Sequence, residues 1–148
     1  MSMSNAAETA LLQLIFNNTN WANVGDATGL RGSSTAGSFY VALHTADPGE
    51  AGDQTTSEAT YTGYARVAVA RSVGGWTVSG NNVSNAGAIT FGACTAGSNT
   101  VLYASVGVAS GGASQIIARA AFTSPASLAI SAGITPSFAA GELDFTVD

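Results

Sequence analysis

Apolar and polar residues alternate in short segments of the chain, a repeat of two that is typical of half-buried β-strands. The clearest case begins at Ser38, where Phe39, Val41 and Leu43 would share one face of a strand. Gly-, Asn- and Pro-rich turns, such as 47–49, separate short segments of this kind. The segments that we expect to be strands are 38–43, 64–71, 76–78, 88–91, 101–108, 115–122, 127–130 and 143–147.

The first part of the chain has a different period and predicts a short helix that ends at Asn17. Its apolar residues recur at helical spacing and would share one face: Ala7, Ala10, Leu11, Leu14 and Ile15. Asn5, with Glu8 three residues later, resembles a capping box. A helix this short is marginal by itself, so its apolar face should dock on the chain's own sheet or on a neighbouring subunit.

The order of these segments predicts an all-β fold with one short N-terminal helix. No helical stretch lies between the expected strands, which excludes a parallel sheet. We expect an antiparallel β-sandwich, jelly-roll-like, with the helix packed at one end. The 148 residues fit a single domain. We divide that domain into a helix and arm at 1–20, an irregular loop at 21–37 and the sandwich at 38–148.

Charged residues are scarce, and this narrows the range of partners. They make up 9% of the chain, against about 25% in typical domains. A surface of that kind tends to associate with other subunits. There is no lysine, the four arginines are scattered, and the net charge is −5. We therefore expect no binding to nucleic acid and none to an anionic membrane surface.

The cysteine content and the hydropathy of the chain argue against a disulfide-linked, cysteine-metal or membrane-spanning protein. Cys94 is the single cysteine, so neither an intrachain disulfide nor a cysteine metal cluster is possible, and we expect a small buried residue there. No apolar run approaches the ~20 residues of a membrane span. The apolar stretch at 10–16 is short and lacks a basic flank, which argues against a signal peptide.

His44 is the one histidine, and its position bears on catalysis. If the strand alternates, its side chain lies opposite Phe39, Val41 and Leu43 and faces solvent or an interface. A catalytic or pH-sensitive role is the alternative. No serine stands in a Gly-x-Ser-x-Gly motif. We expect no catalytic residue, no cofactor, no small-molecule substrate and no enzymatic activity.

Four acids are crowded between residues 47 and 58: Asp47, Glu50, Asp53 and Glu58. Oxygen-rich loops can hold calcium, but this spacing does not match an EF-hand loop. We interpret the segment as a solvated acidic loop and expect no metal site.

Three stretches together resemble a known family. They are 39–52 (FYVALHTADPGEAG), 61–69 (YTGYARVAV) and 136–143 (PSFAAGEL), with an acidic final residue at 148. With the N-terminal helix, they are similar to small tailed-phage virion proteins labelled tail-fibre-like or head-decoration proteins. The resemblance implies a β-rich structural protein without a cofactor. Residues 17–37 are longer than in such relatives and could form an assembly arm.

On this basis we expect a capsid decoration or cement protein in the virion, assembled in the host cytoplasm. Its partners would be the major capsid protein and copies of itself, as a homotrimer. The alternatives are a tail-fibre or tail-associated adsorption protein, and a carbohydrate-binding module. The residues we expect at interfaces are Leu11, Leu14, Ile15, Trp21, Arg31, His44, Asp47 and Glu50.

Overall fold

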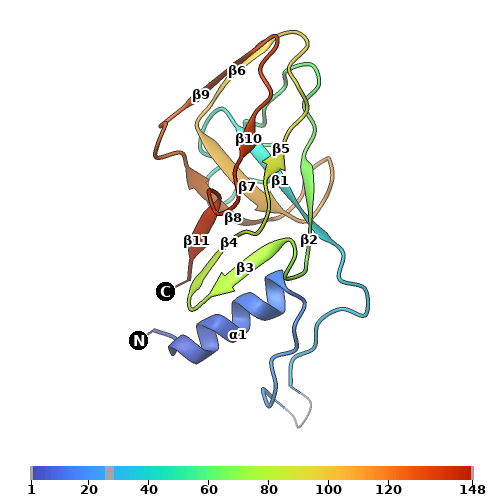
Figure 1. Cartoon of the computed structure of the whole chain (residues 1–148), viewed down its shortest axis with the longest axis vertical. Helices are drawn as coiled ribbons and strands as arrows, with labels where there is room; N and C mark the ends of the chain where they lie inside the picture. The colour runs from blue at the N-terminus through green and yellow to red at the C-terminus, as the bar shows by residue number, and fades with distance from the viewer. Residues whose placement is uncertain (1, 26–28, 148) are drawn as a thin grey trace. The chain divides into compact units, whose positions relative to one another are not determined.

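Antiparallel pairing organises most of the chain in the computed structural model, which describes residues 2–25 and 29–147. The helix and strands of these residues are drawn in Figure 1. They are α1 (Asn5–Phe16), β1 (Ser38–His44), β2 (Val67–Ala70), β3 (Trp76–Ser79), β4 (Asn82–Asn85), β5 (Ile89–Thr90), β6 (Ser98–Val101), β7 (Tyr103–Gly107), β8 (Ile116–Ala121), β9 (Leu128–Ser131), β10 (Ser137–Phe138) and β11 (Asp144–Thr146). The prediction of an all-β, antiparallel, sandwich-like fold with one short N-terminal helix is confirmed.

The described residues group into two compact units. The first takes those within 1–38, 69–89 and 138–148, and the second takes 39–68 and 90–137. The single domain expected for 1–148, and the closer likeness to a jelly roll, stay predictions. Each unit has its own packing and is described by itself.

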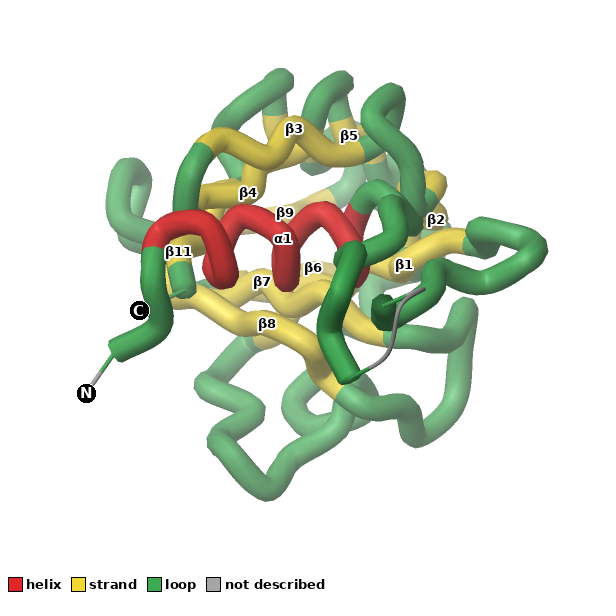
Figure 2. The backbone as a smooth tube through the Cα atoms, turned by 90° about the horizontal axis from the view of Figure 1, so that it is seen from below, coloured by secondary structure: helices red, strands yellow, loops and turns green. Residues whose placement is uncertain are grey.

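In the first unit, α1 packs on a three-stranded sheet of order β11-β4-β3. Figure 2 shows the helix, in red, from the side. Phe16 lies against Trp76 and Phe145, with ring centroids 5.2 and 5.1 Å apart, in the tilted geometries that aromatic pairs prefer. Leu12 and Val83 are buried as well. The helix therefore docks on the chain's own sheet, one of the two alternatives that its length left open.

The helix is rotated relative to the prediction. Its buried residues are Glu8, Leu12 and Phe16, spaced four apart, whereas the five residues expected on the buried face are only half-buried. The reason is the size of the side chains: the predicted face included two alanines as apolar residues and left out Phe16. The largest side chain sets the rotation because its burial removes the most apolar surface from water.

The N-cap of the helix lies one residue earlier than expected. Ser4 is the N-cap, and its hydroxyl accepts a hydrogen bond from the amide of Ala7. The capping box expected from Asn5 and Glu8 is therefore wrong. Glu8 lies in the first turn, where a carboxylate is favoured by the helix dipole.

Arg71 stabilises the other end of α1. Its guanidinium donates to the carbonyls of Ile15 at 2.7 Å and Leu14 at 3.0 Å, and to the carbonyl of Ala36 at 3.1 Å. The last turn of a helix leaves carbonyls without partners inside the helix, and a cation is favourable there. Arg71 thus joins the helix end to the end of the loop that leads to β1.

The second unit contains most of a four-stranded sheet of order β2-β1-β7-β8, antiparallel between β1 and β7 and between β7 and β8. Val41 and Leu43 are buried on one face of β1, as the alternation predicted. Ala42 and His44, on the other face, are buried too. A strand in the middle of a sheet with both faces covered has no solvent-exposed face. Apolar and polar residues therefore need not alternate along it.

Two polar strands differ from the sequence prediction. β4 lies outside the expected strands: Gly80 adopts a positive φ of 63° in the turn after β3, and β4 begins at Asn82. β6, which pairs with β9, overlaps the expected strand 101–108 only at Val101. Both strands carry Ser and Asn, which are poor strand formers, so pairing with a neighbour decides their conformation. Cys94 is buried as a free thiol, as expected.

Candidate functional site

A cluster of polar and charged side chains fills part of the second unit. The segment 45–58 folds against β1 and β7 and brings its polar residues to the face of the sheet that carries His44. The cluster, which we call the polar network, consists of His44, Gln54, Glu58, Tyr64, Arg66, Ser105 and Ser114.

Arg66 is the centre of the polar network. Its side chain is 2% exposed and pairs with Glu58 through both Nε and Nη2, at 2.7 and 2.8 Å. This two-pronged pair raises the pKa of Arg66, and the carboxylate also accepts from the Tyr64 hydroxyl. Burial raises the pKa of that tyrosine. The remaining guanidinium hydrogens donate to the carbonyls of Ala109 and Gly112. A buried guanidinium with partners on several segments holds those segments together.

Gln54 connects the arginine to the sheet. Its Oε1 accepts from Arg66 and from the Ser114 hydroxyl, while its Nε2 donates to the Tyr40 carbonyl and to Ser105. The amide lies directly over Gly107, where a Cβ would come within 2.2 Å of Cδ of Gln54. Glycine is therefore required at 107 so that the amide can reach across β7.

His44 completes the network, and its surroundings fix which nitrogen carries the proton. Nδ1 lies 2.8 Å from the Thr56 carbonyl, which can only accept, so Nδ1 carries the hydrogen. Nε2 lies 2.8 Å from Oγ of Ser105 and accepts its hydroxyl hydrogen. Burial lowers the pKa of His44. The expectation that His44 faces solvent or an interface is wrong: it is 0% exposed, because the segment 45–58 covers that face of β1.

The pair formed by Ser105 and His44 has the distances of a nucleophile with its general base. A reacting serine must also meet a substrate and a group that stabilises an oxyanion. Ser105 is 1% exposed and its oxygen already accepts from Gln54. The pair is sealed from solvent in this arrangement, so its hydrogen bond links the adjacent strands β1 and β7. The other contacts of the two side chains, to the Thr56 carbonyl and to Gln54, hold the segment 45–58 on the sheet.

The four crowded acids do not form one cluster. Asp47 and Glu50 both bind Arg119, at 2.7 and 2.5 Å. Asp53 accepts from the amide and hydroxyl of Thr55, which lowers its pKa, and Glu58 turns inward. Among residues 2–25 and 29–147, no three His, Cys, Asp or Glu side chains gather in a way that could hold a metal ion.

An open groove of about 460 Å³ runs beside β8, the last strand of the four-stranded sheet. Its walls are the turn at Gly49, Glu50 and Gly52 and the segment from Gln115 to Arg119. Ile117 has no partner on β7, since the register shifts there, and it is exposed. We call this feature the β8 groove.

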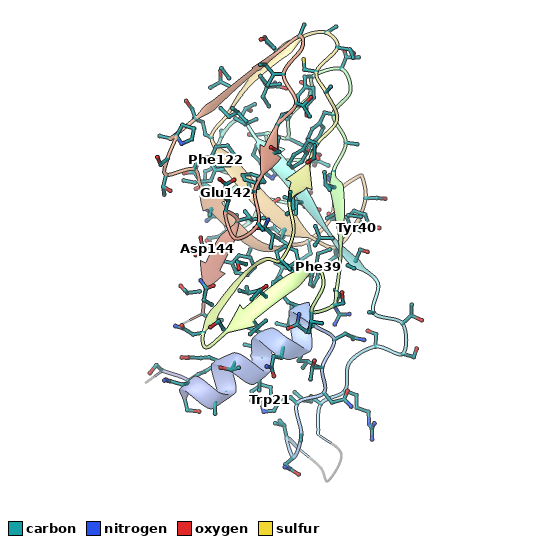
Figure 3. The ribbon with its side chains drawn as sticks, in the orientation of Figure 1. Trp21, Phe39, Tyr40, Phe122, Glu142 and Asp144 are labelled. Carbon is teal, nitrogen blue, oxygen red and sulfur yellow. The ribbon has the colours of Figure 1, made fainter. Side chains whose placement is uncertain are left out.

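The residues expected at interfaces lie in different places. Leu11, Leu14 and Ile15 are half-buried on α1, and His44 is buried. Trp21, labelled in Figure 3 on the segment after α1, is half-buried and pairs through its backbone with Leu30. Arg31 is exposed. Glu50 lines the β8 groove, and both Asp47 and Glu50 bind Arg119. Of the expected loop at 21–37, residues 26–28 lie outside the described part, as does the acidic residue 148 of the family resemblance.

Sequence reasoning missed most of the polar network. Gln54, Ser105 and Ser114 carry no motif, and Arg66 appeared only as one of four scattered arginines. One signal was available: in a chain with no lysine, an arginine in an otherwise apolar alternating segment calls for a buried acid nearby. The helix-capping role of Arg71 and the pairing of Arg119 also depended on contacts distant in sequence.

The fold and this site define a β-rich protein in which three of the four arginines are engaged by other parts of the chain. The chain belongs to the family described as Podophage GP4 fiber I protein gp80, whose pattern matches residues 2–146. It is thus a structural protein of a phage virion, and the expected resemblance to fibre-type proteins is confirmed. No curated protein matches the chain. No helix among the described residues has the length and apolar character to cross a membrane.

Proposed function

We propose that this protein is a structural subunit of a phage fibre, which acts by packing against other virion subunits and catalyses no reaction. The observation that carries the proposal is the match to a fibre protein family over residues 2–146. The use of ionisable groups supports it as well: the buried Arg66 is paired with Glu58 within the polar network, and the only histidine is sealed beneath the segment 45–58.

The surface of the protein also favours assembly over chemistry. Its few charges leave a surface of Ser, Thr, Asn, Gly and Ala, together with exposed apolar side chains such as Val73, Leu30 and Ile134. Such a surface loses little hydration energy when a neighbour covers it. Association with copies of itself, as a homotrimer, and with other virion proteins is the mode of action that we propose.

The decisive experiment is to determine copy number and location in intact particles. Heads and tails are separated after mild disruption, and the chain is quantified in each fraction by mass spectrometry. A fibre subunit should appear in the tail or fibre fraction at a small multiple of the number of fibres. Its absence from all particle fractions would overturn the proposal. Labelling with gold-coupled antibodies on whole virions provides an independent location.

Capsid decoration is the second candidate. It is favoured by the similarity of 39–52, 61–69 and 136–143 to proteins labelled as head-decoration proteins. In that case, the chain should be found with the head fraction at hundreds of copies, next to the major capsid protein. A carbohydrate-binding module has less support, since no aromatic side chain lines the β8 groove.

A further inference from the structure

We propose that the β8 groove is a self-assembly site, and that it receives the segment around Arg31 of a second copy of this chain. This inference rests on the proposed structural function and names the partner and contact surface. It starts from β8 itself. This strand ends the sheet order β2-β1-β7-β8, so within residues 2–25 and 29–147 no strand pairs with the backbone groups on its outer side. Exposed edges of this kind are templates for pairing with another chain.

The edge of β8 has little of the protection that such strands usually carry. Its residues are Ile116–Ala121, with Arg119 as the only charge and no proline. Charged side chains normally keep other strands away from an edge. Here the guanidinium of Arg119 is held by Asp47 and Glu50 on the neighbouring turn. The bulge at Ile117 remains, and it places an exposed apolar side chain in the groove.

Charge identifies what the groove receives. Two carboxylates meet one guanidinium at its border, which leaves an excess of negative charge, and the side chain of Glu50 is 95% exposed. A second copy has no lysine to offer. Arg66, Arg71 and Arg119 are bound within their own chain. Arg31 is exposed and has no partner among the described residues, so it is the cation that another copy can present.

The segment that carries Arg31 is suited to the groove in shape. Leu30, beside it, is 44% exposed and can cover Ile117. The backbone of this segment is already held: Leu30 pairs with Trp21, and the amide of Gly32 donates to the side chain of Asn20. A segment that is ordered before binding loses less conformational entropy on association. Because the groove and the segment are different surfaces, each copy can bind the next, which forms a closed ring if the rotation permits.

Charge reversal in both partners tests the contact. Sedimentation velocity at low salt compares the full-length chain with Arg31→Glu, Glu50→Arg and the double variant. We expect each single variant to weaken association about tenfold or more, and the double variant to restore it, since like charges would be replaced by an attractive pair. Glu142→Arg, which changes the net charge equally at another exposed acid, should leave association unchanged.

Cysteine pairs test the location directly. Cys94 is buried, so a chain with Leu30→Cys and Ile117→Cys keeps Arg31 and has two accessible thiols. Oxidation should produce covalent dimers and larger rings on a non-reducing gel. The control replaces Leu30→Cys with Val73→Cys, at a residue that is 77% exposed. A monomeric wild-type chain, cross-links only within one chain, or equal yields in the control would overturn the proposal.

These outcomes are separate from the test of the proposed function. A chain found in fibres but monomeric in solution would remove the self-assembly site and leave the virion role intact. A chain that forms Arg31-dependent rings but is absent from particles would do the opposite.

Discussion

The two units of the protein fill their interiors with different chemistry. In the first unit the centre is aromatic: Phe16, Trp76 and Phe145 pack between α1 and the β11-β4-β3 sheet. In the second unit a charged arginine, an acid, an amide and a histidine occupy much of one face of the sheet. Apolar packing tolerates substitutions that conserve volume, whereas a buried polar network requires every partner in place. The second unit should therefore be the more sensitive to single substitutions.

Arg66→Ala should have the largest effect. It leaves the carboxylate of Glu58 without its cation and removes donors to two backbone carbonyls. Breaking a buried pair in this way costs about 3–5 kcal/mol of unfolding free energy. Urea denaturation measures the loss. The control is Arg66→Met combined with Glu58→Leu, which removes both charges and should recover much of the stability. A loss no greater than that of a surface substitution would contradict the central role of Arg66.

Phe16→Ala should have the next largest effect, in the first unit. Removing a buried aromatic ring costs about 3–5 kcal/mol, and we expect the lower part of that range because α1 can move toward the space left behind. Thermal unfolding followed by circular dichroism gives the change. Phe16→Leu keeps most of the volume and should cost clearly less. If both variants were equally destabilised, aromatic geometry rather than volume would hold the helix.

The pH dependence of stability should come from His44 in the second unit. Because the folded state lowers the pKa of His44 below 6.5, the unfolded chain binds the proton more readily. The stability that neutral His44 contributes is therefore fully present above pH 6.5. It falls as the pH drops from 6.5 toward the pKa of His44 in the folded state, by at most about 1.4 kcal/mol per pH unit. Glu58 and Asp47 favour the charged ring, whereas burial and Arg66 oppose it. His44→Gln should flatten the urea-denaturation profile between pH 5 and 7, and a profile parallel to wild type would refute this assignment.

Glu50→Gln should have the smallest effect. Although Glu50 binds Arg119, its side chain is almost fully exposed, and Asp47 remains as a partner for the arginine. Exposed ion pairs contribute little to stability. The urea midpoint should stay within the error of the measurement. A clear loss would mean that the turn at 47–52 depends on this pair, and the assembly test would then require Arg31 variants alone.

The sequence determined the class of fold and the kinds of local structure. Alternation at Phe39, Val41 and Leu43 predicted the central strand, and helical spacing before Asn17 predicted the helix. These predictions succeeded because period and turn chemistry are properties of a few consecutive residues. The scarcity of charge and the family resemblance likewise indicated a structural virion protein.

Only the tertiary structure decided how the polar residues are used. Whether His44 faces water depends on the segment 45–58, which folds back so that the Thr56 carbonyl contacts the His44 ring. Arg66 finds Glu58 only once that segment has folded back. The rotation of α1 was likewise set by Trp76 and Phe145, far along the chain. The local sequence pattern indicates which residues prefer to be buried. The partner that makes burial of a charge or a large ring favourable comes from elsewhere in the chain.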